Sequence, residues 1–318
     1  MKGRRRIRGG FETLGMRAGL ALVPRLPRSA VVRLARQVGA AAYAARGRLR
    51  NVGEANIGLA LGHSHTPPER AALLKCAFQA ASLVGLDLLW FARDPERRIP
   101  AWIEIEPDLE QMLNGRAQIL ITGHHGNWEL MGQAIALRGY PLSSVATPLS
   151  NPAVDRLLVR ARAESGQEIV PREGAVLRLL RRIRSGGKIA LLLDQNTLPK
   201  EGGVFVDFFG VPVPVSRAPA LLALRTGTPI GFAWALPRTG GRYRGLTAKT
   251  IDPREFGDRA TPETILRLTQ AITARLEDAV RRWPEHWVWM YKRWKHIPPG
   301  TSPDGFPFYA KPFRPPQA

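Results

Sequence analysis

The feature that most constrains the fold is an alternation that begins at residue 118, where short apolar runs take turns with amphipathic helical patterns. The runs at 118–122, 143–147, 188–193 and 229–236 predict strands, and those at 128–138, 152–164, 175–184, 218–226 and 261–282 predict helices. Strands that alternate with helices indicate an α/β fold, because each crossover helix returns the chain to a parallel neighbour. We therefore expect a mixed, largely parallel sheet flanked by helices, with an N-terminal helical region that associates with a membrane.

The N-terminal region carries much of a strong positive charge. The chain has 47 Lys and Arg against 26 Asp and Glu, a formal net charge of +21, and such an excess predicts attraction to a polyanion or an anionic membrane. Residues 1–50 hold 13 of these cations and a single acid, Glu12. An apolar helical stripe runs through Val31, Leu34, Val38, Ala41 and Ala45. The stripe fits a helix in a membrane interface and equally a helix packed on the domain with an arginine-rich solvated face.

The remaining sequence features concern targeting segments, the cysteine and the division of the chain into regions. No secretory signal pattern follows the basic start, and no run of about 18 uncharged apolar residues predicts a membrane span. The single cysteine, Cys76, lies in an apolar helical stretch and is expected to be a small buried residue. We expect a basic helical region at 1–67, an α/β domain at 68–297 and a loop-like tail at 298–318.

The chemistry is concentrated in the segment 123–129, Gly-His-His-Gly-Asn-Trp-Glu. It lies where an apolar strand ends and a helix begins, the edge of an α/β sheet at which ligands bind. His124 falls in the turn and Glu129 about one helical turn later, so the carboxylate can reach one imidazole nitrogen while the other takes a proton from a hydroxyl. Gly126 allows the sharp turn and leaves room for a substrate beside it. The pattern predicts His124 as a general base oriented by Glu129.

Two other interpretations of this segment stay open on spacing alone. His124, His125 and Glu129 could ligate a metal, although the spacing is not that of the paired helical histidines of zinc proteases, and we expect no metal. Alternatively, the histidines are structural and Asn127 caps the following helix.

Six blocks in order resemble the bacterial lipid A biosynthesis lauroyl/myristoyl acyltransferase family, within the lysophospholipid acyltransferase superfamily. The first two are Asn56-Ile57 and the His-x-x-x-x-Glu motif at 124–129. The others are Asn151-Pro152 with Arg162 to Gly166, Asp194-Gln195 with the Phe-Phe-Gly at 208–210, Arg217 to Gly227, and Pro284 to Lys295. The resemblance spans about residues 45–297.

The resemblance implies an O-acyltransferase in which His124 deprotonates an acceptor hydroxyl and Glu129 orients His124. Arg162 is the candidate for stabilising the oxyanion or gripping a donor phosphate, with an exposed helix arginine as the alternative. The residues expected to contact substrate are Gly126, Asn127, Asp194 and Gln195. No cofactor is expected beyond the co-substrate, acyl carrier protein or acyl-CoA.

The implied acceptor is a lipid A precursor, with another glycolipid or a lysophospholipid as the alternative. Better-known members of the family carry an N-terminal transmembrane segment, whereas this chain has a shorter basic amphipathic one. We therefore expect peripheral or monotopic attachment to anionic lipids on the cytoplasmic face of the bacterial inner membrane. The net charge leaves a nucleic-acid binding protein as a competing class, but no nucleic-acid motif is found, so no nucleic acid is expected as a partner. A hydrolase that uses the same base on water is the remaining alternative.

The carboxyl-terminal block combines tryptophan with basic residues. Trp287 and Trp289 alternate and are expected to point into the core, and anchoring at the lipid headgroups is the alternative for the cluster.

Overall fold

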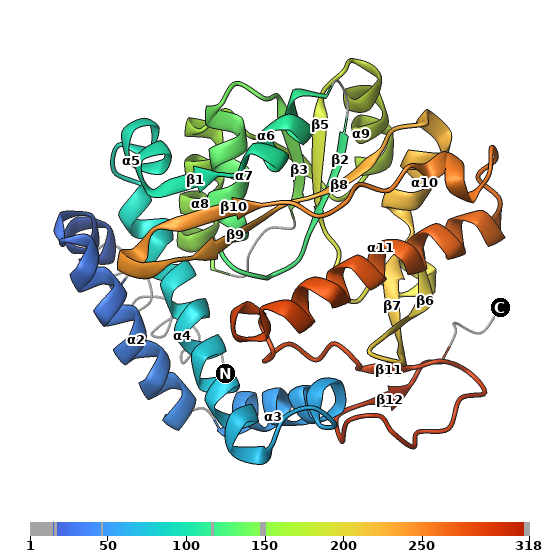
Figure 1. The fold of residues 1–318 in the computed structure, drawn as a ribbon, viewed down its shortest axis with the longest axis horizontal. Helices are drawn as coiled ribbons and strands as arrows, with labels where there is room; N and C mark the ends of the chain where they lie inside the picture. Colours follow the sequence, from blue (N-terminus) through green and yellow to red (C-terminus); the bar gives the residue numbers. More distant parts are fainter. Residues whose placement is uncertain (1–14, 16–17, 46, 116–117, 147–150, 315–318) are drawn as a thin grey trace.

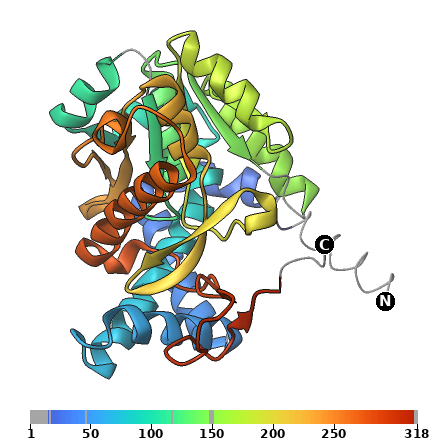
Figure 2. The same cartoon turned by 90° about the vertical axis from the view of Figure 1, so that its right-hand side faces the viewer.

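The structure is a computed structural model in which the chain is described at residues 15, 18–45, 47–115, 118–146 and 151–314. Figures 1 and 2 show the described elements from two directions. The basic residues at 2–8 and half of the residues in the apolar stretch 11–22 lie outside the described part, and residues 18–22 are helical.

A five-stranded parallel sheet forms the centre of the molecule. Its strands are β2 (Gln118–Thr122), β3 (Leu142–Ala146), β4 (Glu168–Pro171), β5 (Lys188–Leu192) and β8 (Ile230–Phe232). They lie in the order β4-β3-β5-β2-β8, and every neighbouring pair is parallel. The prediction of a largely parallel sheet flanked by helices is confirmed. The sequence did not predict the order, which places β2 directly beside β5 at the centre.

Apolar residues on the two faces of this sheet belong to two separate cores. Along β2, Ile119 and Ile121 face one core while Leu120 faces the other, as the period of a strand requires. The helices α9 (Ala175–Arg184), α10 (Ala218–Thr226) and α11 (Pro262–Arg282) supply the first core. The helix α7 (Trp128–Leu137) supplies the second and contacts α8 (Pro152–Glu164). Figure 1 shows α7 and α8 on one side of the sheet and α9 on the other.

The predicted strand 229–236 is two strands in two sheets. β8 ends at Phe232, and β9 (Trp234–Pro237) then joins β10 (Tyr243–Leu246) and β1 (Ile103–Ile105) in a second sheet. The apolar run is unbroken because both strands are buried, so hydrophobicity alone could not reveal the change of sheet.

The remaining elements outside the N-terminal helices are short helices and two further strand pairs. They are α5 (Pro95–Trp102), α6 (Pro107–Asn114), the hairpin β6 (Gly203–Phe208) and β7 (Val211–Ser216), the pair β11 (His296–Ile297) and β12 (Lys311–Pro312), and the short 3-10 helices Val23–Arg25, Pro199–Glu201, Thr239–Gly241, Pro253–Phe256 and Pro284–His286.

The N-terminal helices are α2 (Arg28–Ala45), α3 (Gly47–Leu61) and α4 (Pro67–Phe91). α2 packs along α4 with the stripe Arg28, Val31, Ala35 and Gly39, and not with most of the predicted apolar stripe. A Cβ atom on Gly39 would collide with the backbone of α4, so the close approach selects glycine there. Val38 is left 46% exposed.

The helix α4 is long and apolar enough to cross a membrane by length and composition. This differs from the sequence-based expectation of no span, which required an uncharged run, whereas α4 contains Asp87. In the structure α4 packs against α2, α3 and α7, and 39% of its most apolar stretch is buried by these contacts and the rest of the protein.

Two further expectations concern single side chains. Cys76 is exposed on α4, so the expectation of a buried cysteine is wrong; the residue faces away from the packed stripe of its helix. Trp287 and Trp289 are 2% and 0% exposed, which confirms that they pack in the core.

Candidate active site

The loop from Gly123 to Asn127 joins β2 to α7 at the carboxyl edge of the central sheet. Backbone hydrogen bonds hold this loop against two neighbouring segments. Gly126 N donates to His286 O at 3.0 Å, and Asn127 N donates to Ala235 O of β9 at 2.8 Å. Gly126 has a φ of +63°, and a Cβ there would overlap the carbonyl of Ala235. Glycine is therefore required both by the left-handed conformation and by the close approach to β9.

His124 is held by the carboxylate of Asp194, which follows β5. Its Nδ1 lies 2.8 Å from Asp194 Oδ1, and its backbone N–H donates to Asp194 Oδ2 at 2.7 Å. The indole N–H of Trp287 donates to the same Oδ2 at 2.9 Å. Three donors thus fix one carboxylate, and the carboxylate fixes the imidazole.

The electrostatics of this pair favour a basic imidazole. Burial lowers the pKa of His124, but the charge and hydrogen bond of Asp194 outweigh burial and leave that pKa above its ordinary value. Burial raises the pKa of Asp194, and the stronger effect of His124 and the other donors brings it down to about 2. The carboxylate is therefore ionised at neutral pH, and it stabilises a proton on His124.

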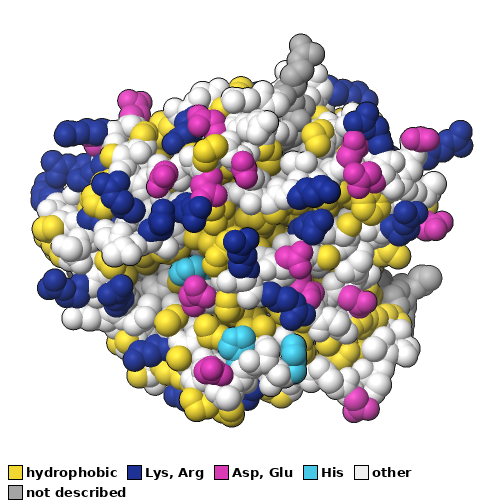
Figure 3. Space-filling model, viewed as in Figure 1, with side chains coloured by type: hydrophobic (Ala, Val, Ile, Leu, Met, Phe, Trp, Pro, Cys, Tyr) yellow, Lys and Arg dark blue, Asp and Glu magenta, His cyan; other side chains and the backbone are white. Residues whose placement is uncertain are grey.

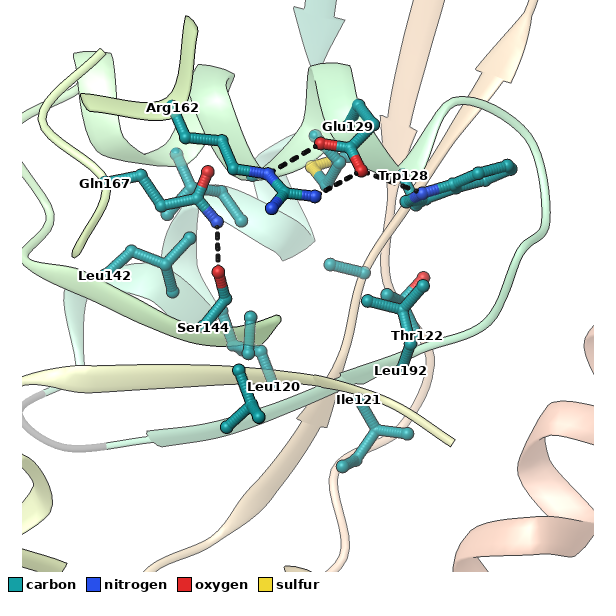
Figure 4. Close-up of a pocket in the computed structure, with 16 residues that line it drawn as sticks. Leu120, Ile121, Thr122, Trp128, Glu129, Leu142, Ser144, Arg162, Gln167 and Leu192 are labelled. Atoms are coloured by element: carbon teal, nitrogen blue, oxygen red, sulfur yellow. Dashed lines mark hydrogen bonds and ion pairs between the residues drawn. The ribbon is translucent and has the colours of Figure 1, made fainter. Parts of the chain in front are cut away.

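The structure places Glu129 differently from the prediction, because its carboxylate is bonded to Arg162 and not to His124. Arg162 Nε donates to Glu129 Oε2 at 3.0 Å and Nη2 donates to Oε1 at 2.7 Å, a two-pronged ion pair between α7 and α8 (Figure 4). The physical reason is the helix: Glu129 lies in the first turn of α7 and projects toward α8. Its negative charge still raises the pKa of His124 from nearby. Arg162 is accordingly not an exposed helix arginine, since its side chain is 15% exposed.

The predicted substrate contacts fall into two groups. Gln195 is exposed, and its amide nitrogen lies 3.4 Å from His124 Nε2, so it borders the open side of the imidazole. Asn127 is 1% exposed, and its Oδ1 accepts the N–H of Leu130 as the N-cap of α7. The side chain of Asn127 is therefore turned into the protein and not toward a substrate. Asp194 is likewise 6% exposed and its oxygens are occupied by protein donors.

His125 points away from His124 despite being its neighbour. It is 1% exposed, and its Nε2 lies 2.8 Å from the carbonyl oxygen of Trp283. Burial lowers the pKa of His125 to about 4, against a weaker opposing effect of that carbonyl. The ring is therefore neutral at pH 7, with Nε2 protonated. His125 is a structural histidine of the buried core.

A narrow cavity opens beside the Glu129–Arg162 pair (Figure 4). Its walls combine Leu120, Leu142 and other apolar residues of β2, β3 and α7 with Gln167 and Ser144, which are hydrogen bonded to each other at 2.7 Å. The cavity volume of about 50 Å³ has room for a few water molecules, so a long acyl chain enters only if wall side chains move. Trp128 lines this cavity and packs against the ring of His124 at 4.7 Å between centroids.

Sequence reasoning missed Asp194 as the partner of His124, and Trp287 and Trp128 as its supports. The usable signal for Asp194 was its place at the end of a buried strand. What the sequence lacked was the order of strands, which brings the ends of β2 and β5 together. Within the described residues, no cluster of three or more histidine, cysteine, aspartate or glutamate side chains could hold a metal ion.

Comparison with known proteins decides the family. Residues 7–296 match the model of the bacterial lipid A biosynthesis acyltransferases. The chain belongs to this family. It is 25% identical over 303 residues to the lipid A biosynthesis lauroyltransferase of Escherichia coli, covering 91% of each chain. It is 22% identical over 284 residues to the palmitoleoyltransferase of the same organism, covering 87% of this chain and 89% of the relative.

A second group of relatives acts on a different class of lipid by name. The chain is 26% identical over 192 residues to the phosphatidylinositol mannoside acyltransferase of Mycolicibacterium smegmatis, and the match spans 57% of each chain. The match thus spans little more than half the length of these mannoside-specific relatives.

Proposed function

We propose that this protein moves a fatty acyl chain from an acyl thioester to a hydroxyl of a glycolipid acceptor. The observation that carries the proposal is the His124–Asp194 pair, in which a buried carboxylate holds Nδ1 and Nε2 lies beside the exposed Gln195. Family membership supports the same reaction, because the relatives that cover most of the chain are named for acyl transfer in lipid A biosynthesis.

The proposed chemistry begins with a proton transfer. With Nδ1–H donated to Asp194, His124 presents the lone pair of Nε2, which takes the proton of the acceptor hydroxyl as its oxygen attacks the thioester carbonyl. The tetrahedral intermediate then collapses, the carbon–sulfur bond breaks, and the imidazolium returns the proton to the leaving thiolate. Asp194 stabilises the imidazolium between these two steps, which is the role of the carboxylate in other histidine-based acyl transfer sites.

Arg162 is the proposed source of positive charge for the oxyanion or for a donor phosphate. It lies on the cavity wall, and Glu129 holds its Nε and Nη2 in place through the two hydrogen bonds described above. In this arrangement Glu129 acts on the reaction through Arg162 and through its charge near His124. A fixed guanidinium in a partly dry site stabilises developing negative charge without reorganising during the reaction.

The net positive charge supports two further proposals, the class of acyl donor and the attachment of the protein to a membrane. The donor is acyl carrier protein or acyl-CoA, both of which present negative charge to a protein with a formal +21. Lysine and arginine side chains are spread over the face shown in Figure 3, interspersed with acidic ones. The same charge would hold the protein peripherally on the anionic cytoplasmic face of the inner membrane. The acceptor is proposed to be a lipid A precursor, with a phosphatidylinositol mannoside as the alternative that the second group of relatives supports.

The test is acyl transfer from radiolabelled acyl carrier protein, and separately from acyl-CoA, to a bacterial membrane lipid extract. We expect one labelled lipid with the wild type and a loss of about 10⁴-fold in rate for His124→Ala, because the proton acceptor is gone. The mass of the product identifies the acceptor and the chain. Equal product from wild type and His124→Ala, or fatty acid release without lipid product, would contradict the proposal.

A further inference from the structure

The described residues contain a buried polar cluster that the reaction above does not use. It consists of Arg28, Asp87, Asn127 and Tyr243, which come from α2, α4, the N-cap of α7 and β10. Arg28 is 5% exposed, Asp87 2%, Asn127 1% and Tyr243 1%. Charged residues are seldom buried to this extent without a specific partner, so we asked what this cluster holds in place.

Asp87 is the centre of the cluster. Its Oδ1 accepts a hydrogen bond from Arg28 Nη1, and its Oδ2 accepts from the Tyr243 hydroxyl and, at 2.9 Å, from Asn127 Nδ2. Burial and then the charge of Asp87 raise the pKa of Tyr243 well above its usual range, so its hydroxyl remains a donor at any physiological pH. Three donors from three different elements thus converge on one carboxylate.

The carboxylate determines which way the Asn127 amide faces. Asn127 Oδ1 must face the N–H of Leu130, 3.0 Å away, to cap α7, and this requires Nδ2 to face the opposite side. Burial raises the pKa of Asp87 against the opposing effects of Arg28, Tyr243 and Asn127. Both carboxylate oxygens face donors, and Oδ2 already accepts from the Tyr243 hydroxyl, so Asp87 favours that orientation and opposes the flipped amide, which would bring two acceptors together. Asp87 therefore selects the capping rotamer of Asn127.

The first turn that Asn127 caps carries two residues of the site. Trp128 packs against the His124 ring, and Glu129 holds Arg162. Only three residues, His125 to Asn127, separate His124 from this turn, so a shift of the cap would reach both the imidazole and the ion pair. Displacements of about 1 Å in a catalytic group can lower a rate by about 100-fold.

We infer that Asp87 is a positioning residue for the acyl transfer proposed above, and that Arg28, as its counter-ion, makes the geometry of the site depend on the docking of helix α2. Arg28 is held in turn by Gly241 O, to which its Nε donates at 2.9 Å, and its guanidinium lies 5.0 Å from the ring of Trp90. The buried Arg28–Asp87 ion pair thereby connects helix α2 to the first turn of α7.

The test is an exchange of the two side chains, with an activity readout and a structural one. Asp87→Asn removes the charged acceptor, and Asn127→Asp puts a second carboxylate against Asp87. We expect each to lower kcat by about 10- to 100-fold with KM for the acyl donor changed less than about threefold. The double variant Asp87→Asn/Asn127→Asp restores one carboxylate and one amide, so we expect it to recover at least tenfold over the worse single variant.

Hydrogen–deuterium exchange of the segment 123–132 provides a readout that needs no catalysis. We expect faster exchange there in both single variants and recovery in the double variant. Leu268→Ala is the matched control, because this residue is fully buried in α11, on the other face of the sheet. It should lower Tm while leaving kcat per folded protein and exchange at 123–132 unchanged.

The outcomes separate the two proposals. Unchanged kcat and exchange in Asp87→Asn, or a double variant no better than the product of the single effects, would overturn the positioning role. Parallel changes in Leu268→Ala would also overturn it, because the effect would then be general destabilisation. If the wild type transfers no acyl group, the proposed function fails, and exchange at 123–132 still decides whether Asp87 positions α7.

Discussion

Two carboxylates lie beside His124, and they belong to different parts of the fold. Asp194 follows a central strand, is 6% exposed and bonds the imidazole directly. Glu129 lies in the first turn of a helix on one side of the sheet, and its oxygens are taken by the guanidinium of Arg162. The residue that the His-x-x-x-x-Glu spacing indicates is thus the ion-pair partner of Arg162, whereas the residue 70 positions away holds the imidazole of His124. Spacing along the chain predicts that Glu129 lies near His124, but the order of the strands determines that Asp194 is the carboxylate bonded to it.

The largest expected difference between the two carboxylates is in rate. Asp194→Asn leaves the shape of the side chain but offers an amide that can donate to Nδ1, which favours the wrong tautomer of His124. We expect kcat to fall on the order of 10⁴-fold, as the same change of an orienting carboxylate does in histidine-based acyl transfer. Steady-state kinetics with a saturating thioester donor measures it, and a loss smaller than that of Glu129→Gln would reverse the comparison.

A smaller effect is expected at the other carboxylate. Glu129→Gln weakens the grip on Arg162 but leaves the His124–Asp194 pair intact, so we expect kcat to fall about tenfold. The rate should rise with pH through the pKa of His124, since the neutral imidazole is the proposed base. The midpoint of that rise should move down only slightly in Glu129→Gln, and further in Asp194→Asn, because Asp194 contributes more to the raised pKa of His124. The pH profiles of kcat for the three proteins make the comparison, and a larger shift in Glu129→Gln would contradict it.

The smallest effect on rate is expected at His125, and its effect on stability depends on pH. The folded state holds the pKa of His125 at about 4, below the 6.5 of an exposed histidine. The unfolded chain therefore binds the extra proton first, and stability falls as the pH drops from 6.5 toward 4. His125→Gln removes this contribution, so between pH 7 and pH 5 the variant should lose about 2 kcal/mol less stability than the wild type.

Urea unfolding at the two pH values measures that difference, and kcat at pH 7.5 should change less than about threefold. His124→Gln serves as the control at the neighbouring ring. The pKa of His124 is raised in the folded protein, so its pH dependence of stability has the opposite sign to that of His125. The stabilisation from the charged His124–Asp194 pair is present at low pH and is lost as the pH rises through the pKa of His124. Equal pH dependence in wild type and His125→Gln would show that His125 is not buried as a neutral ring.

Much of the fold was predictable because its signals are local. The bounds of β2, α8, α9 and α10 follow directly from apolar periodicity and from flanking glycine and proline. Trp287 was predicted to be buried, although its hydrogen bond to Asp194 was not. Two features could not be predicted from these local signals. The split of 229–236 between two sheets left no mark in hydrophobicity because both halves are buried. The face of α2 that packs on α4 was missed because the closest approach of the two helices is at a glycine, Gly39, which adds nothing to an apolar stripe.

The sequence located the segment that forms the candidate site, but not the hydrogen bonds within it. His124, Glu129, Arg162 and Gln195 all lie near one another, yet the partners within this set were wrong, because a carboxylate one helical turn away can point to either neighbour. Asn127 was taken as a substrate contact, although the alternative of a helix cap was already weighed, and the cap is what the structure shows. Asp87 gave no signal at all, since an aspartate within an apolar helix identifies no partner by itself.

The most direct test of the account is the titration of His124 by NMR of selectively ¹⁵N-labelled histidine in wild type, Asp194→Asn and Glu129→Gln. The account predicts that the pKa of His124 in the wild type lies above 6.5, with Nδ1 protonated in the neutral form. In Asp194→Asn the pKa should fall and the tautomer should change, while Glu129→Gln should keep the Nδ1–H tautomer. Loss of that tautomer in Glu129→Gln, with its retention in Asp194→Asn, would contradict the assignment of Asp194 as the residue that orients the base.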